Sequence, residues 1–148
     1  HFVNKDGIVV ALFLSGMQDH SAMQEQALSE SASAEQGVKS VVRCYIQWID
    51  ENPDWARFVF RYRSLVENSQ LSEENETRKR AHFKRLKEWF APHIESQKIK
   101  KLPIEVYHSL IIGPSQDFAL RWLRGKTKCS LMDYQALYAE SAWQAIKV

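Results

Sequence analysis

The chain has 148 residues, 45% of them hydrophobic and 26% charged, which is enough for one domain with its own core and too short for two comfortable domains. A formal net charge of +2 is too small to indicate a nucleic-acid-binding surface by itself, and the longest apolar stretch, Ile8 to Leu14, is too short to cross a bilayer. The two cysteines, Cys44 and Cys129, do not make a disulfide framework and are typical of reduced thiols in a cytoplasmic protein.

Apolar residues recur at helical spacing along most of the chain, and strand alternation is hard to find, so we predict an all-α fold of about six helices. The first helix is expected to begin after Asn4, a good N-cap. The Ser-, Ala- and Glu-rich run from Leu28 to Gly37 is interpreted as a connection. Ser33 and Gln36 are expected to form a capping box at the start of the second helix.

Asn52-Pro53 predicts a break before the third helix, with Asn52 as the cap and Pro53 at the first helical position. Ser72 is expected to begin a long fourth helix, whose basic run from Arg78 to Lys87 is interpreted as a solvated face rather than a nucleic-acid-binding one. The fifth helix is predicted from about Pro103 to Arg124. Pro114 is expected to kink it, and Gly125 to cap it. A sixth helix is predicted from Ser130.

Three segments carry a family resemblance. The N-terminal His1-Phe2-Val3-Asn4-Lys5, followed by Asp6-Gly7 and an apolar helix, is the first. The second is the run Trp48 to Phe58 around Asn52-Pro53, and the third is Ile111 to Gly125, which contains Gly113, Phe118, Trp122 and Leu123. In this order the three segments resemble bacterial regulators of the tetracycline-repressor (TetR) family.

The resemblance implies that residues 1–5 are the remnant of a junction with a DNA-binding domain and residues 6–148 an effector-binding and dimerisation domain. The helix-turn-helix that would bind operator DNA is then missing from this sequence. The resemblance further implies a homodimer and DNA release by a small hydrophobic or aromatic effector, which makes the protein a transcriptional regulator, expected to be a repressor, and not an enzyme. His1 and Lys5 are placed where the family contacts the DNA backbone.

Large inward side chains with polar ends are the candidates for an effector pocket, since small ligands use apolar cavities with a few polar groups. These predicted ligand-binding residues are Tyr62, Trp89, His93, Tyr107 and His108. The dimer interface is predicted on the last two helices, where apolar and small residues extend to a second face. Its predicted residues are Ile112, Gly113, Gln116, Ala119, Leu120, Leu123, Leu137, Tyr138 and Trp143.

The sequence offers little evidence for a metal site or for a catalytic site. Glu105-x-x-His108 matches half of a helical di-iron motif, but no second such pair is present, so we predict no metal and no cofactor. Phosphate-binding glycine motifs and nucleophile elbows are also absent from the sequence. Two alternatives remain open at this point: a helical small-molecule-binding enzyme or carrier, and a protein–protein adaptor that docks through an exposed apolar patch.

Overall fold

The computed structural model describes residues 5–68 and 72–148, which form seven α-helices, one 3-10 turn and one isolated antiparallel bridge between Ile99 and Lys147. The elements are α1 (Lys5–Ser29), α2 (Ala34–Glu51), α3 (Pro53–Glu67), α4 (Ser72–Glu95), α5 (Ile104–Ile111), α6 (Gly113–Leu123), η1 (Met132–Tyr134) and α7 (Gln135–Ile146). The prediction of an all-α fold is confirmed.

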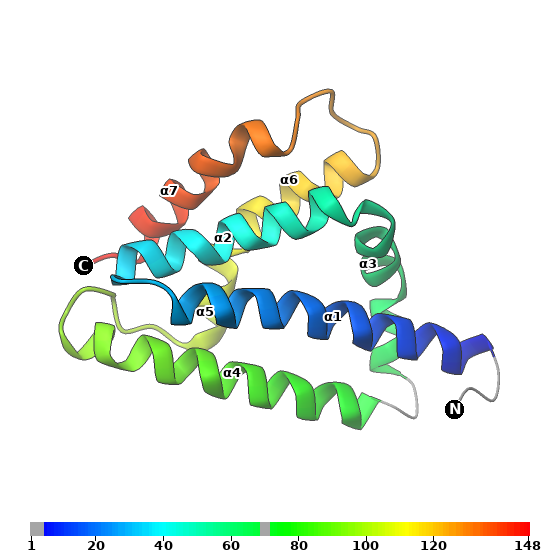
Figure 1. Cartoon of the computed structure of the whole chain (residues 1–148), viewed down its shortest axis with the longest axis horizontal. Coiled ribbons are helices and arrows are strands. Elements are labelled where there is room, and N and C mark those ends of the chain that lie inside the picture. Colours follow the sequence, from blue (N-terminus) through cyan, green and yellow to red (C-terminus); the bar gives the residue numbers. More distant parts are fainter. Residues whose placement is uncertain (1–4, 69–71) are drawn as a thin grey trace.

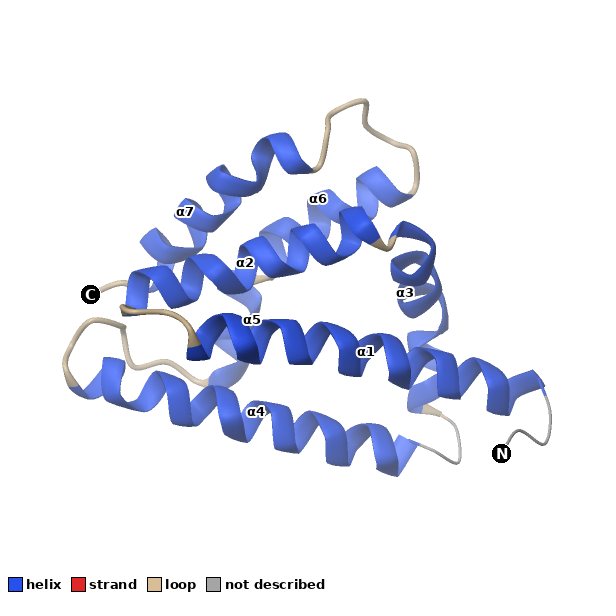
Figure 2. Cartoon of the chain, viewed as in Figure 1, coloured by secondary structure: helices blue, strands red, loops and turns tan. Residues whose placement is uncertain are grey.

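Helix α2 lies at the centre of the bundle and packs most extensively on α1 and α7 (Figure 1). Its side chains Val38, Val42, Ile46 and Ile49 are buried because they recur every three or four residues on one face. Helix α1 also packs on α4 and α3, so it contacts three other helices, and Figure 2 shows how little of the chain lies in loops. The core therefore surrounds α1 and α2.

The connection between α1 and α2 is shorter than the sequence indicated. Helix α1 continues to Ser29 and α2 begins at Ala34, so most of the run from Leu28 to Gly37 is helical and its interpretation as a connection is wrong. Alanine and glutamate are strong helix formers, and Leu28 is buried, so a helix can continue there. Ser33 Oγ accepts from the Gln36 N–H at 3.1 Å, as expected of a capping residue.

The breaks that Pro53, Pro114 and Gly125 make between helices have local causes. Pro53 is the first residue of α3, as expected, but the Asn52 amide donates to the Trp48 carbonyl at 2.9 Å and so ends α2 instead of capping α3. The predicted fifth helix is divided at Ile112 into α5 and α6, because Pro114 has no N–H to continue the hydrogen-bond ladder. Gly125 ends α6 with a φ of +67°, as its C-cap position predicts.

Close packing fixes α4 against the rest of the bundle. Gly37 of α2 lies under the Trp89 indole, so that a Cβ at this position would lie 2.0 Å from Trp89 Cζ2. Trp89 in turn contacts Phe90 edge-on and lies beside His93. This contact brings the C-terminal half of α4 to the start of α2.

Candidate functional site

A cavity of about 290 Å³ lies inside the bundle, and residues from each of the helices α1 to α6 line it. Helix α1 contributes Phe13, Met17, His20 and Gln24, whose spacing of three or four residues places them on one face. This volume is at the small end of the roughly 300–1,000 Å³ found in small-molecule pockets. The cavity is therefore large enough for a small organic molecule.

Most of the cavity wall is apolar. Aromatic rings and branched side chains from α1, α3 and α4 make up much of this surface, including Phe13, Val59, Phe60, Phe83, Leu86 and Phe90. Phe90 is stacked on Tyr107 of α5 with ring centroids 4.8 Å apart, which holds both rings in place. Such a wall suits a ring or a short hydrocarbon body.

Two buried polar groups at the cavity have no hydrogen-bond partner among the residues that the structure describes. These are Nε2 of His20 and the hydroxyl of Tyr45, whose rings are 5.4 Å apart in an edge-on arrangement. Burial lowers the pKa of His20 to about 4 and raises the pKa of Tyr45, so both side chains are neutral near pH 7. A buried polar group without a partner costs about 1–3 kcal/mol, which a polar ligand atom would recover.

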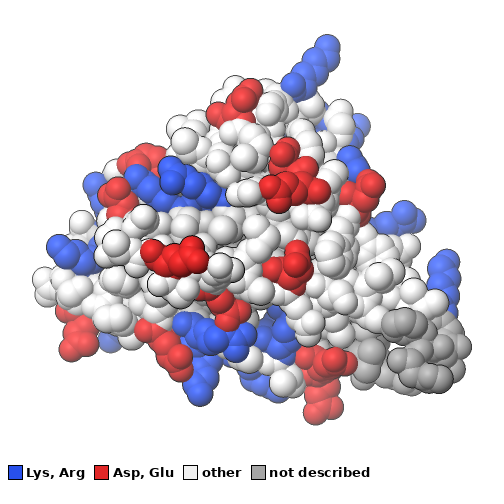
Figure 3. All heavy atoms as spheres, viewed as in Figure 1, with Lys and Arg blue, Asp and Glu red and all other residues white. Residues whose placement is uncertain are grey.

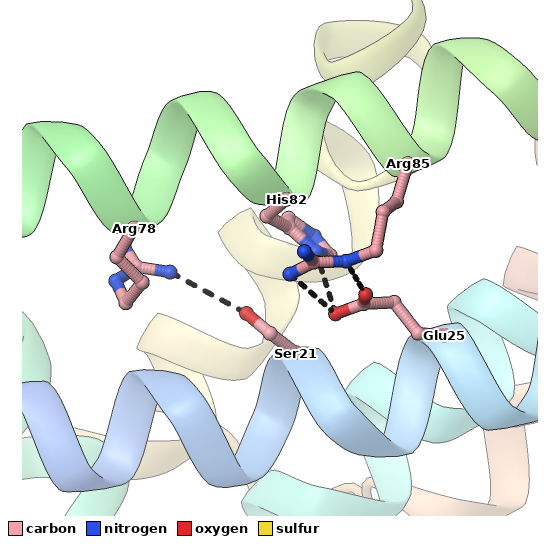
Figure 4. A network of polar contacts seen from close by, with 5 residues as sticks. All are labelled: Ser21, Glu25, Arg78, His82 and Arg85. Atoms are coloured by element: carbon pink, nitrogen blue, oxygen red, sulfur yellow. Dashed lines mark hydrogen bonds and ion pairs between the residues drawn. The ribbon is translucent and has the colours of Figure 1, made fainter.

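A polar network joins α1 to α4 beside the cavity (Figure 4). The Glu25 carboxylate accepts from the Arg85 guanidinium and lies 3.3 Å from His82 Nδ1, while Arg78 donates to Ser21 Oγ at 3.4 Å. Burial, helped by the charge of Arg78, lowers the pKa of His82 to about 4. His82 is therefore a neutral imidazole that donates its Nδ1–H to Glu25.

Two guanidinium groups, those of Arg63 on α3 and Arg78 on α4, line the same cavity. Neither forms an ion pair with a carboxylate of the described residues. Burial and the charge of Arg63 lower the pKa of Arg78, and the same two causes lower the pKa of His108. The polar end of the cavity therefore has a positive electrostatic character.

The predicted ligand-binding residues divide into two groups. Tyr107 and His108 line the cavity, whereas Tyr62, Trp89 and His93 are not among the residues that line it. The Tyr107 hydroxyl donates to the Lys100 carbonyl and accepts from the Leu102 N–H at 2.9 Å, so it presents its ring to the cavity and not a free polar group.

The three residues outside the lining have other contacts. Trp89 covers Gly37, His93 packs on Trp89, and the Tyr62 ring packs at a tilt on Phe58 with centroids 4.8 Å apart. The sequence predicts them on inward stripes, but α3 and α4 each pack on more than one helix, and these three side chains contact neighbouring side chains instead of the cavity. The expectation that they line the pocket therefore has to be corrected.

Several lining residues were missed from the sequence. Helix α4 places Asn75, Arg78, His82 and Leu86 on its inward face in line with Phe90, at intervals of three or four residues. The signal was available, because polar residues continue the apolar stripe of Leu86 and Phe90 toward the N-terminus of this helix. The prediction from the sequence instead places the whole basic run on the solvated face. That assignment suits the exposed Arg80, Lys84, Arg85 and Lys87, but not Arg78.

The predicted interface residues also have mixed positions. Ile112, Ala119, Leu123 and Trp143 are buried in the core of their own chain, and Gln116 lines the cavity. They complete the monomer's core because α2 packs against both α6 and α7, which corrects the expectation that they face a partner. The remaining four, Gly113, Leu120, Leu137 and Tyr138, are partly or fully exposed, and Leu137 has 63% of its surface accessible.

The predicted DNA-backbone residues lie at one end of the chain. Lys5 is the exposed first residue of α1, and His1 lies outside the described residues. On the face shown in Figure 3, basic side chains alternate with acidic ones along the edge that α4 forms.

No helix in the described ranges is long and apolar enough to span a membrane. Over those same ranges, no group of three or more His, Cys, Asp or Glu side chains could hold a metal ion.

The whole architecture is similar to that of a TetR family transcription regulator from Marinobacter aquaeolei VT8, seen in a crystal structure. The TM-score is 0.79 at 16% sequence identity, and the similarity covers 99% of this chain and 75% of that chain. The fold is TetR-like. No protein-family model and no curated protein matches the sequence. The comparison therefore supports the fold that the sequence motifs implied.

Proposed function

We propose that this chain is the effector-binding and dimerisation domain of a TetR-type transcriptional regulator, a repressor that leaves its operator DNA when a small molecule fills the cavity. The observation that carries the proposal is a cavity of about 290 Å³ within a TetR-like fold, lined by one face of α1. Lys5 at the start of α1 would contact the DNA backbone, and we propose the same role for His1. In this proposal the domain catalyses no reaction.

The coupling in this proposal passes through α1. One face of this helix lines the cavity, and its N-terminal end is where the DNA-binding domain would be attached. A ligand that binds better to one position of α1 than to another shifts the equilibrium between them. Contacts of Ser21 and Glu25 with α4 are the ones that such a shift would strain or relax.

Ligand binding can be tested by thermal unfolding of the chain against a panel of small apolar and aromatic compounds of all charges. A ligand that binds only the native state raises the unfolding midpoint by mass action. In Met17→Trp the indole occupies the cavity, so the shift should be lost. Leu12→Trp, on the exposed side of the same helix, is the matched control and should keep the shift. If no compound of any charge shifts the midpoint, or if Met17→Trp keeps the shift, the proposed function is wrong.

Dimerisation can be tested through the exposed apolar residues of η1 and α7. Met132, Tyr134 and Leu137 are exposed in the single chain, and an isologous interface of more than about 1,000 Å² would bury them. Leu137→Glu should convert a dimer to a monomer in sedimentation equilibrium at micromolar concentration. Leu12→Glu, also exposed but on α1, should leave the dimer intact. A native chain that is monomeric at this concentration contradicts the dimer.

A further inference from the structure

We infer that the effector of this domain is an organic anion, a carboxylate on a compact apolar or aromatic body, with its charge held by Arg78 and Arg63. This inference rests on the proposed function and specifies its ligand. The geometry that supports it is the pairing of an apolar wall with two guanidinium groups on one cavity.

The charges around the cavity are unbalanced. Among the described lining residues the cations are Arg63, Arg78 and Lys79, and the one carboxylate is that of Glu67. Lys79 is paired with Glu76 at 3.4 Å, outside the cavity wall. Two guanidinium groups therefore remain opposite a single carboxylate, and a bound anion would relieve the repulsion between them.

Arg78 is the better placed of the two. It projects from α4 toward Ser21 of α1 (Figure 4), and its other protein partner is the buried Asn75, whose Oδ1 accepts from Nη2 at 3.2 Å. Both partners are neutral, so the charge of this half-buried guanidinium is not compensated by a hydrogen-bonded acid. A guanidinium binds a carboxylate through two parallel hydrogen bonds, and such bonds are about twice as strong as neutral ones.

The unpaired groups at the cavity are also suited to an acceptor-rich ligand. The Tyr45 hydroxyl can donate a hydrogen bond, and the neutral His20 ring donates from Nε2 in one of its two tautomers. A carboxylate has two oxygens and about four acceptor positions, so it can satisfy several donors at once. A cationic ligand would instead meet two guanidinium groups and find one carboxylate, that of Glu67, among the described lining residues.

The volume limits the apolar part of the molecule. A cavity of about 290 Å³ takes a bicyclic aromatic acid or a short-chain carboxylate, and it is too small for a long acyl chain with a bulky headgroup. The rings of Phe13, Phe60 and Phe83 favour an aromatic body through stacked and edge-on contacts.

The test uses three probes with one body: 2-naphthoate, the neutral 2-naphthamide and the cationic 2-naphthylmethylammonium. Isothermal titration of the native chain should give an affinity for 2-naphthoate at least about tenfold higher than for the amide, a difference of roughly 1.4 kcal/mol, and weaker binding still for the ammonium. The advantage of the anion should fall with added salt.

Variants separate the charge from the shape of the site. Arg78→Gln should lower the affinity for 2-naphthoate by about tenfold and leave the affinity for 2-naphthamide nearly unchanged. Arg80→Gln, on the exposed side of α4, is the matched control and should bind both probes like the native chain. If the Arg78 variant is unstable, Arg63→Gln, at an exposed position of the cavity lining, provides a second measurement of the preference for 2-naphthoate.

The inference is overturned if the amide or the ammonium binds as tightly as the carboxylate. It is also overturned if the preference for the carboxylate survives in both arginine variants. Either result leaves the proposed function standing, because in both cases a small molecule still binds in the cavity, whatever its charge and whichever residues hold it. The proposed function fails separately, when no compound of any charge raises the unfolding midpoint of the chain.

Discussion

Acidification should destabilise the domain well above the pH range in which carboxylates titrate, because burial lowers the pKa of His108 and, more strongly, the pKa of His20 and of His82. Burial lowers the pKa of His20 and of His82 from 6.5 to about 4. At pH 7 these rings are neutral in both the folded and the unfolded state. Between about pH 6.5 and pH 4 the unfolded state binds protons that the folded state does not, so the free energy of unfolding falls as the pH falls.

The size of the effect follows from the shift. One pKa unit corresponds to 1.36 kcal/mol, so a histidine with a folded pKa near 4 contributes a loss on the order of 2–3 kcal/mol by pH 4. Charges near these rings act in both directions. Arg78 opposes protonation of both histidines, and Asp19 favours protonation of His20, while Glu25 accepts a hydrogen bond from His82. Two such losses are a large part of the roughly 5–15 kcal/mol that stabilises a typical domain.

Urea unfolding followed by far-ultraviolet circular dichroism at pH 7.5, 6.5, 5.5 and 4.5 measures this loss. The native chain should lose stability steadily below pH 6.5, and the variant with both His20→Gln and His82→Gln should lose much less. His93→Gln, which removes a histidine outside the cavity, should keep the native slope. If the double variant and the native chain show the same dependence on pH, the two rings are not the cause.

Three smaller changes test other details of the structure. Gly37→Ala should destabilise the chain by about 1–2 kcal/mol in chemical denaturation, because the new Cβ would overlap the Trp89 ring. Gly113→Ala should not destabilise it in the same assay, because its nearest neighbour, Ser109 Oγ, would lie 3.9 Å from the new Cβ. Gln97 follows α4 with a φ of +61°, a backbone conformation that glycine adopts without strain. Gln97→Gly should therefore raise the free energy of unfolding by about 0.5–1 kcal/mol in the same assay. Residues 1–148 alone should show no sequence-specific footprint on operator DNA at physiological salt, and a specific footprint would contradict the proposed division of roles.

Helical periodicity predicted the fold class because each helix buries a continuous stripe, and such stripes are visible in the sequence. Helix α2 is the clearest case, with Val38, Val42 and Ile46 all fully buried. Residues that act locally were also predictable: Pro53 begins a helix, and Gly125 ends one. Their effect depends on backbone geometry at one position and not on what packs nearby.

The cavity could be predicted only in part, because a stripe shows that a residue points inward but not what it meets there. Tyr107 and Trp89 both lie on apolar stripes, yet Tyr107 borders empty space and Trp89 covers a glycine on another helix. That difference depends on which helices meet, which periodicity does not encode. The interface prediction failed in the same way for Ile112 and Ala119, whose surplus apolar surface is used by the core of the same chain.

The most informative residues of the site were those that broke the hydrophobic pattern. His20, Arg78 and His82 occupy inward positions where an apolar residue would pack at lower cost, and each keeps a polar group at the cavity or next to it. Burying such groups costs stability unless they find partners, so a fold that needed only a core would gain by replacing them. The cost is understandable if a ligand supplies the missing partner. Arg78→Met therefore separates the two possibilities: it should keep or raise the unfolding midpoint of the empty chain while abolishing the preference for 2-naphthoate over 2-naphthamide. A strong loss of stability in this variant, with the preference retained, would assign Arg78 to the structure of the domain and not to its ligand.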